Sequence, residues 1–390
     1  MRQPPHIPLV AGGAVGSFGR FVERSLPQIA VPVIQDALTT AGVEPGDVQA
    51  AFVGNAFGGA IVDQESILAQ VLLQPAGLNG IPMQTVKNAC SSGSSAMHLA
   101  WSCVAYQQYE CVLVLGAEKL THVDKRKSFA ALATATDHPS VDENRSVFMD
   151  VNAERAKRYM SSYGATARHF ATVAAKNRKH ASLNERASLR TPISIDEVLQ
   201  DRVVVPPLTR AMCGGVVDGA ACLILVSPDF AARRGLPNAT RVVASALVSG
   251  VNDGAATASA TARAGAAAYA QSGVDPKDIA VAEVHDSTAP QELFDLEDLK
   301  FCGRGEAIRL LEEGVTALGG RLPVNTSGGL ISRGHPVGAT GVAQIVEIHE
   351  QLVGRAGARQ AGSPKVGLAQ MAGGLLGNDS AVATVHVLTV

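Results

Sequence analysis

Apolar and polar residues alternate in blocks along this chain, and some of these blocks repeat. Residues 41–55 read AGVEPGDVQAAFVGN and residues 272–286 read SGVDPKDIAVAEVHD, so that Gly, Val, Pro, Asp and an Ala match at equal positions. Each copy follows an Ala-rich run of helical character, passes through an acidic turn and ends in an apolar, β-branched strand. The pattern predicts one helix–turn–strand unit in each part of the chain.

A second pair of segments repeats as well. CSSGSSA aligns with HPVGATG, which places Cys90 opposite His335 and Gly93 opposite Gly338. A strand-like piece precedes each segment (MQTVKN and RLPVN), and a helical run and another short strand follow each. Because the two pairs are spaced differently, we interpret the chain as two diverged halves rather than as an array of repeats.

These units predict a mixed α/β fold in which helices cover the sheets. We assign residues 1–228 to an N-terminal half and 229–390 to a C-terminal half. Residues 119–215 carry basic runs such as DKRKS and AAKNRKH and are interpreted as an inserted, mostly helical lobe within the first half. Pseudo-symmetry between the halves would bring Cys90 and His335 together, each at the N-terminus of a helix.

Composition narrows the class of protein. Hydrophobic residues make up 46% of the 390 positions and aromatic residues only 4%, so the core must be packed mainly from aliphatic side chains. A formal net charge of -2 gives no electrostatic argument for binding nucleic acid or an anionic membrane. No apolar run is long enough to span a bilayer, and no signal peptide is recognised. We therefore expect a cytoplasmic protein that binds neither nucleic acid nor membrane.

The chain has 6 cysteines, none in a C-x-x-C pair, so neither a metal site nor a redox dithiol is predicted. Most are expected to be small buried residues. Cys90 differs because it lies among Gly and Ser at a predicted helix start. A helix N-terminus favours the thiolate, so a lowered pKa is expected for this thiol. A structural, buried cysteine is the alternative, but the setting opposite His335 favours a nucleophile.

Two histidines and a glycine-rich segment are further candidates for an active site. His335 lies between a glycine and a proline in SRGHPVGATG, where a role in core packing is difficult to explain. A loop histidine that caps a helix is the alternative. His285 ends the apolar strand IAVAEVHDSTA. The run MAGGLLGND is either a turn or a place where backbone N–H groups approach a substrate, as an oxyanion hole requires. It is no G-x-G-x-x-G element, so no dinucleotide is predicted.

Four segments resemble the thiolase superfamily: NACSSGSSA, HDST, VNTSGGLISRGHPVGATG and GLAQMAGG. The His-Asp start of HDST resembles the sterol-carrier-protein type. The resemblance covers nearly the whole chain and implies a five-layered αβαβα fold of two pseudo-symmetric halves, with an inserted loop domain that covers coenzyme A. It also implies a homodimer or homotetramer that uses coenzyme A thioesters as substrates and holds no tightly bound cofactor.

The same resemblance implies roles for single residues. Cys90 is then the nucleophile that takes an acyl group from a coenzyme A thioester, and His335 activates it. His335 and His285 together resemble a first oxyanion hole. The backbone N–H groups of Cys90 and Gly374 resemble a second, in which one missing donor costs on the order of a hundredfold in rate. No residue of the basic lobe is assigned to coenzyme A.

One departure from the family pattern limits the prediction. Thiolases use a second cysteine as acid and base, and the two places where it occurs hold Ala372 and Ser287 here. Neither is a good base near neutral pH. A histidine could take over, since Cys-His-His sets resemble those of decarboxylating ketoacyl synthases. We expect an acyltransferase for thiolytic cleavage or Claisen-type condensation. The alternatives are a biosynthetic condensing acyltransferase without the second cysteine, and a thiolase-fold subunit that depends on a small OB-fold partner protein.

Overall fold

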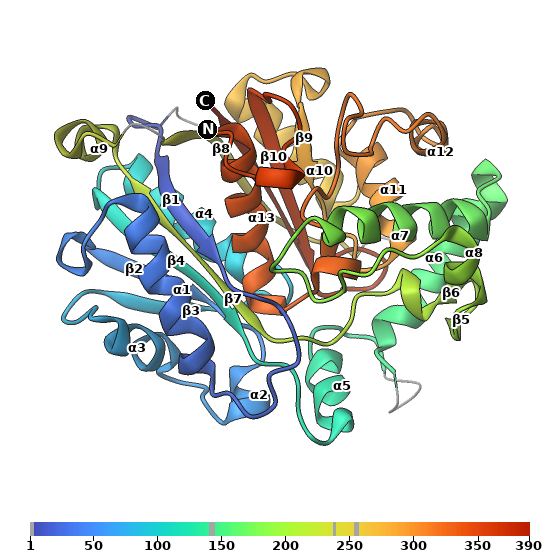
Figure 1. Cartoon of the computed structure of the whole chain (residues 1–390), viewed down its shortest axis with the longest axis horizontal. Helices are drawn as coiled ribbons and strands as arrows, with labels where there is room; N and C mark the ends of the chain where they lie inside the picture. The colour runs from blue at the N-terminus through green and yellow to red at the C-terminus, as the bar shows by residue number, and fades with distance from the viewer. Residues whose placement is uncertain (1–3, 140–144, 237–238, 253–256) are drawn as a thin grey trace.

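One nine-stranded mixed sheet runs through the molecule (Figure 1). The computed structural model describes residues 4–139, 145–236, 239–252 and 257–390. The strand order is β3-β2-β4-β7-β1-β8-β11-β10-β9. The N-terminal strands are β1 (Leu9–Val15), β2 (Ala50–Gly54), β3 (Met83–Val86), β4 (Cys111–Glu118) and β7 (Gly219–Val226). The C-terminal strands are β8 (Thr240–Ser249), β9 (Val281–Glu283), β10 (Val366–Gly373) and β11 (Val382–Thr389).

The sheet has an internal pseudo-symmetry about the junction of β1 with β8. Outward from this junction, β7 and then β4 pair antiparallel, and β2 and β3 follow in parallel. On the other side, β11 and then β10 pair antiparallel, and β9 follows in parallel. The two predicted halves therefore have the same topology. RLPVN does not form a strand; only Val324 bridges to Ala282, in the place that β3 occupies in the first half.

Matching helices end on matching residues. Helix α1 (Leu26–Ala41) and helix α10 (Ala260–Ser272) both end at a left-handed glycine, Gly42 with φ 65° and Gly273 with φ 72°. These two glycines are equivalent in the repeated segments, and glycine adopts this conformation without the strain that a Cβ would cause. The sequence repeat therefore includes the glycine that ends the helix in each half.

Five layers result, as the family resemblance implies. Helix α1 covers the outer face of the N-terminal strands, and α10 that of the C-terminal strands. Helices α4 (Ser92–Ala105) and α13 (Val337–Leu352) pack between the two halves of the sheet. Along β7, Cys222 and Ile224 face the α1 side while Leu223 and Leu225 face this central layer, as the two-residue period of a strand requires.

The inserted lobe lies between β4 and β7 in sequence and is mostly helical, as predicted. In Figure 1 most of it lies beside the C-terminal half. It contains α5 (Lys125–Ala133), α6 (Val147–Tyr163), α7 (Ala167–Ser182), α8 (Ile195–Gln200), β5 (Val203–Val205) and β6 (Leu208–Thr209). Shorter helices complete the chain: α2 (Gly58–Val62), α3 (Leu68–Leu73), α9 (Pro228–Arg234), α11 (Ala289–Asp298) and α12 (Ala307–Glu312).

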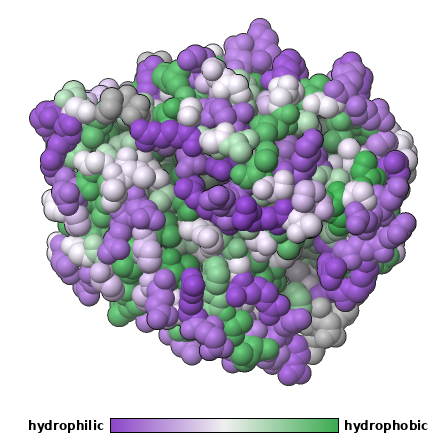
Figure 2. Space-filling view, in the orientation of Figure 1, coloured by the Kyte–Doolittle hydropathy of each residue, from purple (hydrophilic) through white to green (hydrophobic). Residues whose placement is uncertain are grey.

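The surface mixes hydrophilic and hydrophobic groups on the face shown in Figure 2, with no continuous apolar band across it. Among the described residues, no helix has both the length and the apolar character needed to cross a membrane.

Candidate active site

Cys90 lies in the sharp turn that joins β3 to α4. The residue before it, Ala89, has φ 48°, a left-handed conformation that costs energy for any residue with a Cβ. Ser91 is the N-cap of α4, so Cys90 directly precedes the helix. The predicted position at a helix start is therefore observed, and the strained turn holds the thiol just ahead of the helix, at the wall of a cavity.

His335 occupies the equivalent place before α13, whose N-cap is Pro336. Its Nδ1 lies 2.8 Å from Oγ1 of Thr340, and that hydroxyl donates to the Pro336 carbonyl at 2.9 Å. Because the hydroxyl has only one hydrogen, we assign the imidazole proton to Nδ1, which donates to Thr340. The buried Nε2 has no hydrogen-bond partner among the residues that the structure describes and carries the free lone pair.

His285 follows β9 and is buried. Its backbone N–H donates to Oε1 of Gln370 at 2.8 Å, and its Nδ1 lies 3.3 Å from the sulfur of Met371. The next residue, Asp286, accepts the N–H of Leu330 at 2.6 Å. These contacts hold the loop after β9 against β10 and fix the direction of the His285 ring.

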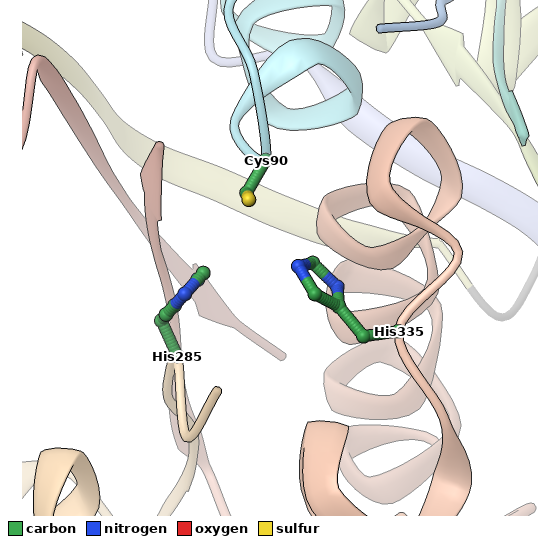
Figure 3. A group of neighbouring side chains, drawn as sticks. All are labelled: Cys90, His285 and His335. Carbon is green, nitrogen blue, oxygen red and sulfur yellow. The ribbon is translucent and has the colours of Figure 1, made fainter. Parts of the chain in front are cut away.

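The three side chains meet, Cys90 and His335 as the pseudo-symmetry predicts and His285 as the family resemblance implies. The sulfur of Cys90 and one ring nitrogen of each histidine, His285 and His335, lie within 4.8 Å of one another. The two imidazoles are edge-to-face, with centroids 5.5 Å apart and an angle of 85°. In Figure 3 the sulfur points toward the space between the two rings. Thiol and imidazole are also zinc ligands, so this group is able to hold a metal, and the metal-free site remains a prediction.

Glycines allow the two helix starts to approach so closely. A Cβ on Gly93 would lie 2.5 Å from the carbonyl oxygen of Gly338, and a Cβ on Gly338 would lie 2.7 Å from that of Gly54. Gly93 and Gly338 are the two residues that the repeat aligns. Their contact at the crossing of α4 and α13 is the reason why Cys90 and His335, each three residues earlier, face the same space.

The pKa of the Cys90 thiol is raised, whereas a lowered pKa was expected from the sequence. Burial raises the pKa of Cys90 to about 12, while a hydrogen bond from the Gly374 backbone N–H lowers it by less. The predicted lowered pKa is therefore wrong, because desolvation outweighs the helix N-terminus here. Burial also lowers the pKa of His285 to about 4 and that of His335 well below 6.5. All three groups are neutral at rest.

Gly374 follows β10 in a left-handed conformation, with φ 64°. A Cβ there would lie 2.8 Å from the Ala135 carbonyl oxygen, so glycine is required both by conformation and by space. Its N–H is directed at the Cys90 sulfur, as the effect on the thiol pKa indicates. Ala372 and Ser287, which occupy the places of the second family cysteine, line the same cavity.

Sequence reasoning missed Glu118, which ends β4 and is fully buried. Its carboxylate accepts backbone N–H groups from Ala56 (2.9 Å) and Phe57 (3.2 Å) in one half and from Gly338 (3.0 Å) in the other. Burial raises the pKa of Glu118 to about 7. It ties the start of α13 to β4 and so supports the position of His335. An acidic residue at the end of the fully apolar strand CVLVLGAE was a signal that could have identified it.

The three residues open into a cavity of about 270 Å³. Much of its wall is apolar and comes from the inserted lobe, with Phe129, Leu132, Phe148 and Met149 among the lining residues. Four arginines from the same lobe also line it: Arg145, Arg155, Arg202 and Arg210. The lobe therefore covers the reactive group with a wall suited to an apolar chain and anionic groups.

Comparison with known proteins assigns the class. Residues 10–229 match the thiolase N-terminal domain, and residues 244–387 match the thiolase C-terminal domain-like family. The chain is 34% identical to an acetyl-CoA acetyltransferase of Methanothermobacter thermautotrophicus over 97% of this chain and 98% of that protein. It is 32% identical to the benzoylsuccinyl-CoA thiolase subunit BbsB of Thauera aromatica, over 94% of each.

Two further matches agree with this class. Sterol carrier protein 2 of Bos taurus is 34% identical over 88% of this chain and 66% of that protein. A solved structure, the Ltp2-ChsH2(DUF35) aldolase, superimposes with a TM-score of 0.80 at 25% identity over 98% of both chains. The chain thus belongs to the thiolase family. Within that family it is a thiolase-like acyltransferase.

Proposed function

We propose that this acyltransferase works through an acyl-cysteine intermediate on Cys90, formed from an acyl-CoA or a 3-ketoacyl-CoA. The observation that carries the proposal is the unpartnered Nε2 of His335, which lies beside the thiol while Nδ1 is held by Thr340. Nε2 takes the thiol proton as sulfur attacks the thioester carbonyl. From an acyl-CoA, the bond to the coenzyme A sulfur breaks, and the proton passes to that sulfur. From a 3-ketoacyl-CoA, the thiol sulfur attacks the 3-keto carbon instead, the bond between C2 and C3 breaks, and the proton passes to C2 of the coenzyme A ester that leaves.

Charge on oxygen is stabilised at two places in this proposal. His285, and His335 once its Nε2 has taken a proton, donate to the thioester or enolate oxygen of the incoming acyl group. The backbone N–H groups of Cys90 and Gly374 stabilise the oxyanion of the acyl-enzyme. Because Ala372 and Ser287 are poor bases, a proton on carbon is moved by one of the two imidazoles, whose low pKa values leave them unprotonated near neutral pH.

Coenzyme A enters, in this proposal, from the side of Arg20, Lys125 and Arg210. These residues line a cavity of about 380 Å³ that shares Phe129 and Arg210 with the reactive cavity. In the described part of the chain, neither Arg20 nor Lys125 forms an ion pair with a carboxylate, so both are available for phosphate groups. The coenzyme would leave after reaction rather than stay bound.

Assembly and location are proposed on family grounds. We expect a homodimer or homotetramer, which light scattering on the purified protein would measure. The DUF35 component of the matched aldolase supports a search for a small OB-fold partner by co-purification. A cytoplasmic location, expected from the sequence, would be checked by fractionation.

Intact-mass spectrometry after mixing the protein with acyl thioesters tests the function. An acyl-sized mass gain that maps to Cys90, with release of coenzyme A, is expected. Cys90→Ser should abolish it, and His335→Ala should slow it by about a hundredfold or more. Acyl esters of N-acetylcysteamine, which lack the phosphates, should react with a higher KM and a similar limiting rate. An unchanged acylation rate in either variant would overturn the assignment of nucleophile and base.

A further inference from the structure

The reactive cavity adjoins a second cavity besides the one with which it shares Arg210. Arg155, Gln291 and Ser380 line both the reactive cavity and this second one of about 360 Å³. Arg155 is not among the residues that line the cavity assigned to coenzyme A, whereas it lines this second cavity. An acyl chain attached to Cys90 would run along the apolar wall toward Arg155.

Arg155 is a half-buried cation without a carboxylate partner. It lies on α6, and one of its Nη atoms donates to the backbone carbonyl of Asn378 at 2.7 Å. Within the ranges that the structure describes, it forms no ion pair with an acidic side chain. Burial lowers the pKa of its guanidinium. A guanidinium has five N–H donors, and a buried charge is stable only when it is paired, so this group can accept an anion.

Most of the acidic residues around Arg155 already have partners. Asp379 pairs with Arg263 at 3.2 Å and accepts the N–H of Ala260 at 3.0 Å. Asp298 pairs with Arg304 at 2.5 Å. Glu297, on the same wall, accepts from the hydroxyl of Tyr159. Asp295 also acts on Arg155: its Oδ1 accepts from Gln291 at 2.9 Å, and its Oδ2 has no hydrogen-bond partner among the described residues. The charges of Asp379, Asp295 and Asp298 favour the charged form of Arg155, but in the described part of the chain none of these carboxylates forms an ion pair with it.

We propose that the acyl group carried by this enzyme ends in a second carboxylate, which Arg155 binds, so that the substrates are coenzyme A esters of dicarboxylic acids. The inference rests on the proposed acylation of Cys90 and adds a specificity-determining residue to it. The planar guanidinium binds a carboxylate in a two-pronged arrangement, whereas the methyl end of a simple fatty acyl chain would leave the cation unpaired.

Acylation rates with matched thioesters test this. Succinyl-, glutaryl- and adipyl-CoA are compared with butyryl-, valeryl- and hexanoyl-CoA, which have the same number of carbons but no second carboxylate. We expect at least one charged member to acylate Cys90 with a kcat/KM about tenfold or more above its neutral match. Arg155→Gln should remove that preference and leave the neutral esters within about twofold.

A phosphate of coenzyme A is the other anion that could bind Arg155. The same series of thioesters distinguishes this phosphate from the second carboxylate of the acyl group. If Arg155→Gln raises KM equally for charged and neutral esters, the guanidinium binds the coenzyme and the proposal is wrong. Lys157→Gln, at an exposed lysine two residues later on α6 that is not among the lining residues of either cavity, is the matched control. The proposal is also overturned if this control removes the preference as completely as Arg155→Gln does.

Binding without chemistry separates this inference from the proposed function. Titration calorimetry of glutaryl- and valeryl-CoA into the Cys90→Ser protein measures the preference when no acyl-enzyme can form. Tighter binding of the charged ester, lost in the Cys90→Ser/Arg155→Gln protein, supports the carboxylate site even if no ester acylates the wild-type chain. Equal binding across all pairs overturns the site and leaves the proposed acyl transfer untouched.

Discussion

The thiol of Cys90 and the imidazole of His335 are neutral together at rest, so the thiolate forms only as substrate is attacked. Thr340 controls this proton transfer because it holds the imidazole proton on Nδ1 and leaves Nε2 as the base. Thr340→Val keeps the shape but removes the acceptor, so both tautomers become populated. We expect acylation to slow by about tenfold, and Thr340→Ser to restore it. A loss of unfolding free energy with unchanged acylation would mean that Thr340 is only structural.

The pH dependence of wild-type acylation checks the same residue pair. The base form of His335 exists above its pKa, which burial holds well below 6.5. Acidification should therefore leave the rate unchanged until well below pH 6.5. Because burial raises the pKa of Cys90 to about 12, ultraviolet spectra at neutral pH should show no thiolate absorbance above that of Cys90→Ser. An inflection near pH 6.5 would contradict the buried, neutral imidazole.

Residues that carry chemistry were predictable from the sequence to different degrees. Cys90 and His335 occur at aligned positions of two repeated motifs, so pattern alone brought them together. Arg155 and Thr340 carry no such signal. Arg155 sits among the charged residues of ERAKRY, and only the fold shows that it faces a cavity and is contacted by Asn378, far along the chain. The thiol pKa was mispredicted because burial is a property of the folded molecule.

At the scale of elements, the crossing of α4 and α13 determines the distance between the reactive groups. Gly93→Ala would place a Cβ 2.5 Å from the Gly338 carbonyl oxygen, and backbone cannot move aside as a side chain can. We expect unfolding free energy to fall by about 1–3 kcal/mol, and acylation in the folded protein to fall by up to about a hundredfold, since the two helix starts separate. Thermal denaturation and the mass assay measure the two effects.

Gly265→Ala is the matched control for that prediction, because Gly265 is also a helical glycine, in α10. Its nearest neighbour would be the movable tip of Leu299 at 3.2 Å. Alanine favours a helix over glycine by about 1 kcal/mol, so stability and acylation should change little. If both variants behave alike, close backbone contact at the α4–α13 crossing is not what positions the site.

Most elements were predictable because helices and strands leave local patterns, and the repeat gave each pattern twice. RLPVN shows the limit of this reasoning. Its equivalent, MQTVKN, pairs with β2 over four residues as β3, whereas RLPVN makes a single bridge through Val324. A segment forms a strand only along the length of the neighbouring strand with which it can pair. The neighbour of RLPVN, β9, has only three residues. That length is set by tertiary contacts rather than by the strand sequence itself.

At the scale of the whole molecule, the two halves share one core, so they should unfold together. The division into 1–228 and 229–390 remains a prediction from the sequence. The central layer buries Val114 of the first half with Val342 and Ile345 of the second. A shared hydrophobic layer makes either half unstable without the other, because its inner face would be exposed to water.

The single tryptophan makes this testable in the intact chain. Trp101 lies on α4, and its indole N–H donates to the Val242 carbonyl on β8 at 2.9 Å, so its fluorescence reports contact between the halves. Circular dichroism reports the helices of both halves. In denaturant, the two signals should change at the same midpoint, as for one cooperative transition. Loss of the tryptophan signal well before the helical signal would mean that the halves separate while still folded, and that the shared layer contributes little to the stability of each.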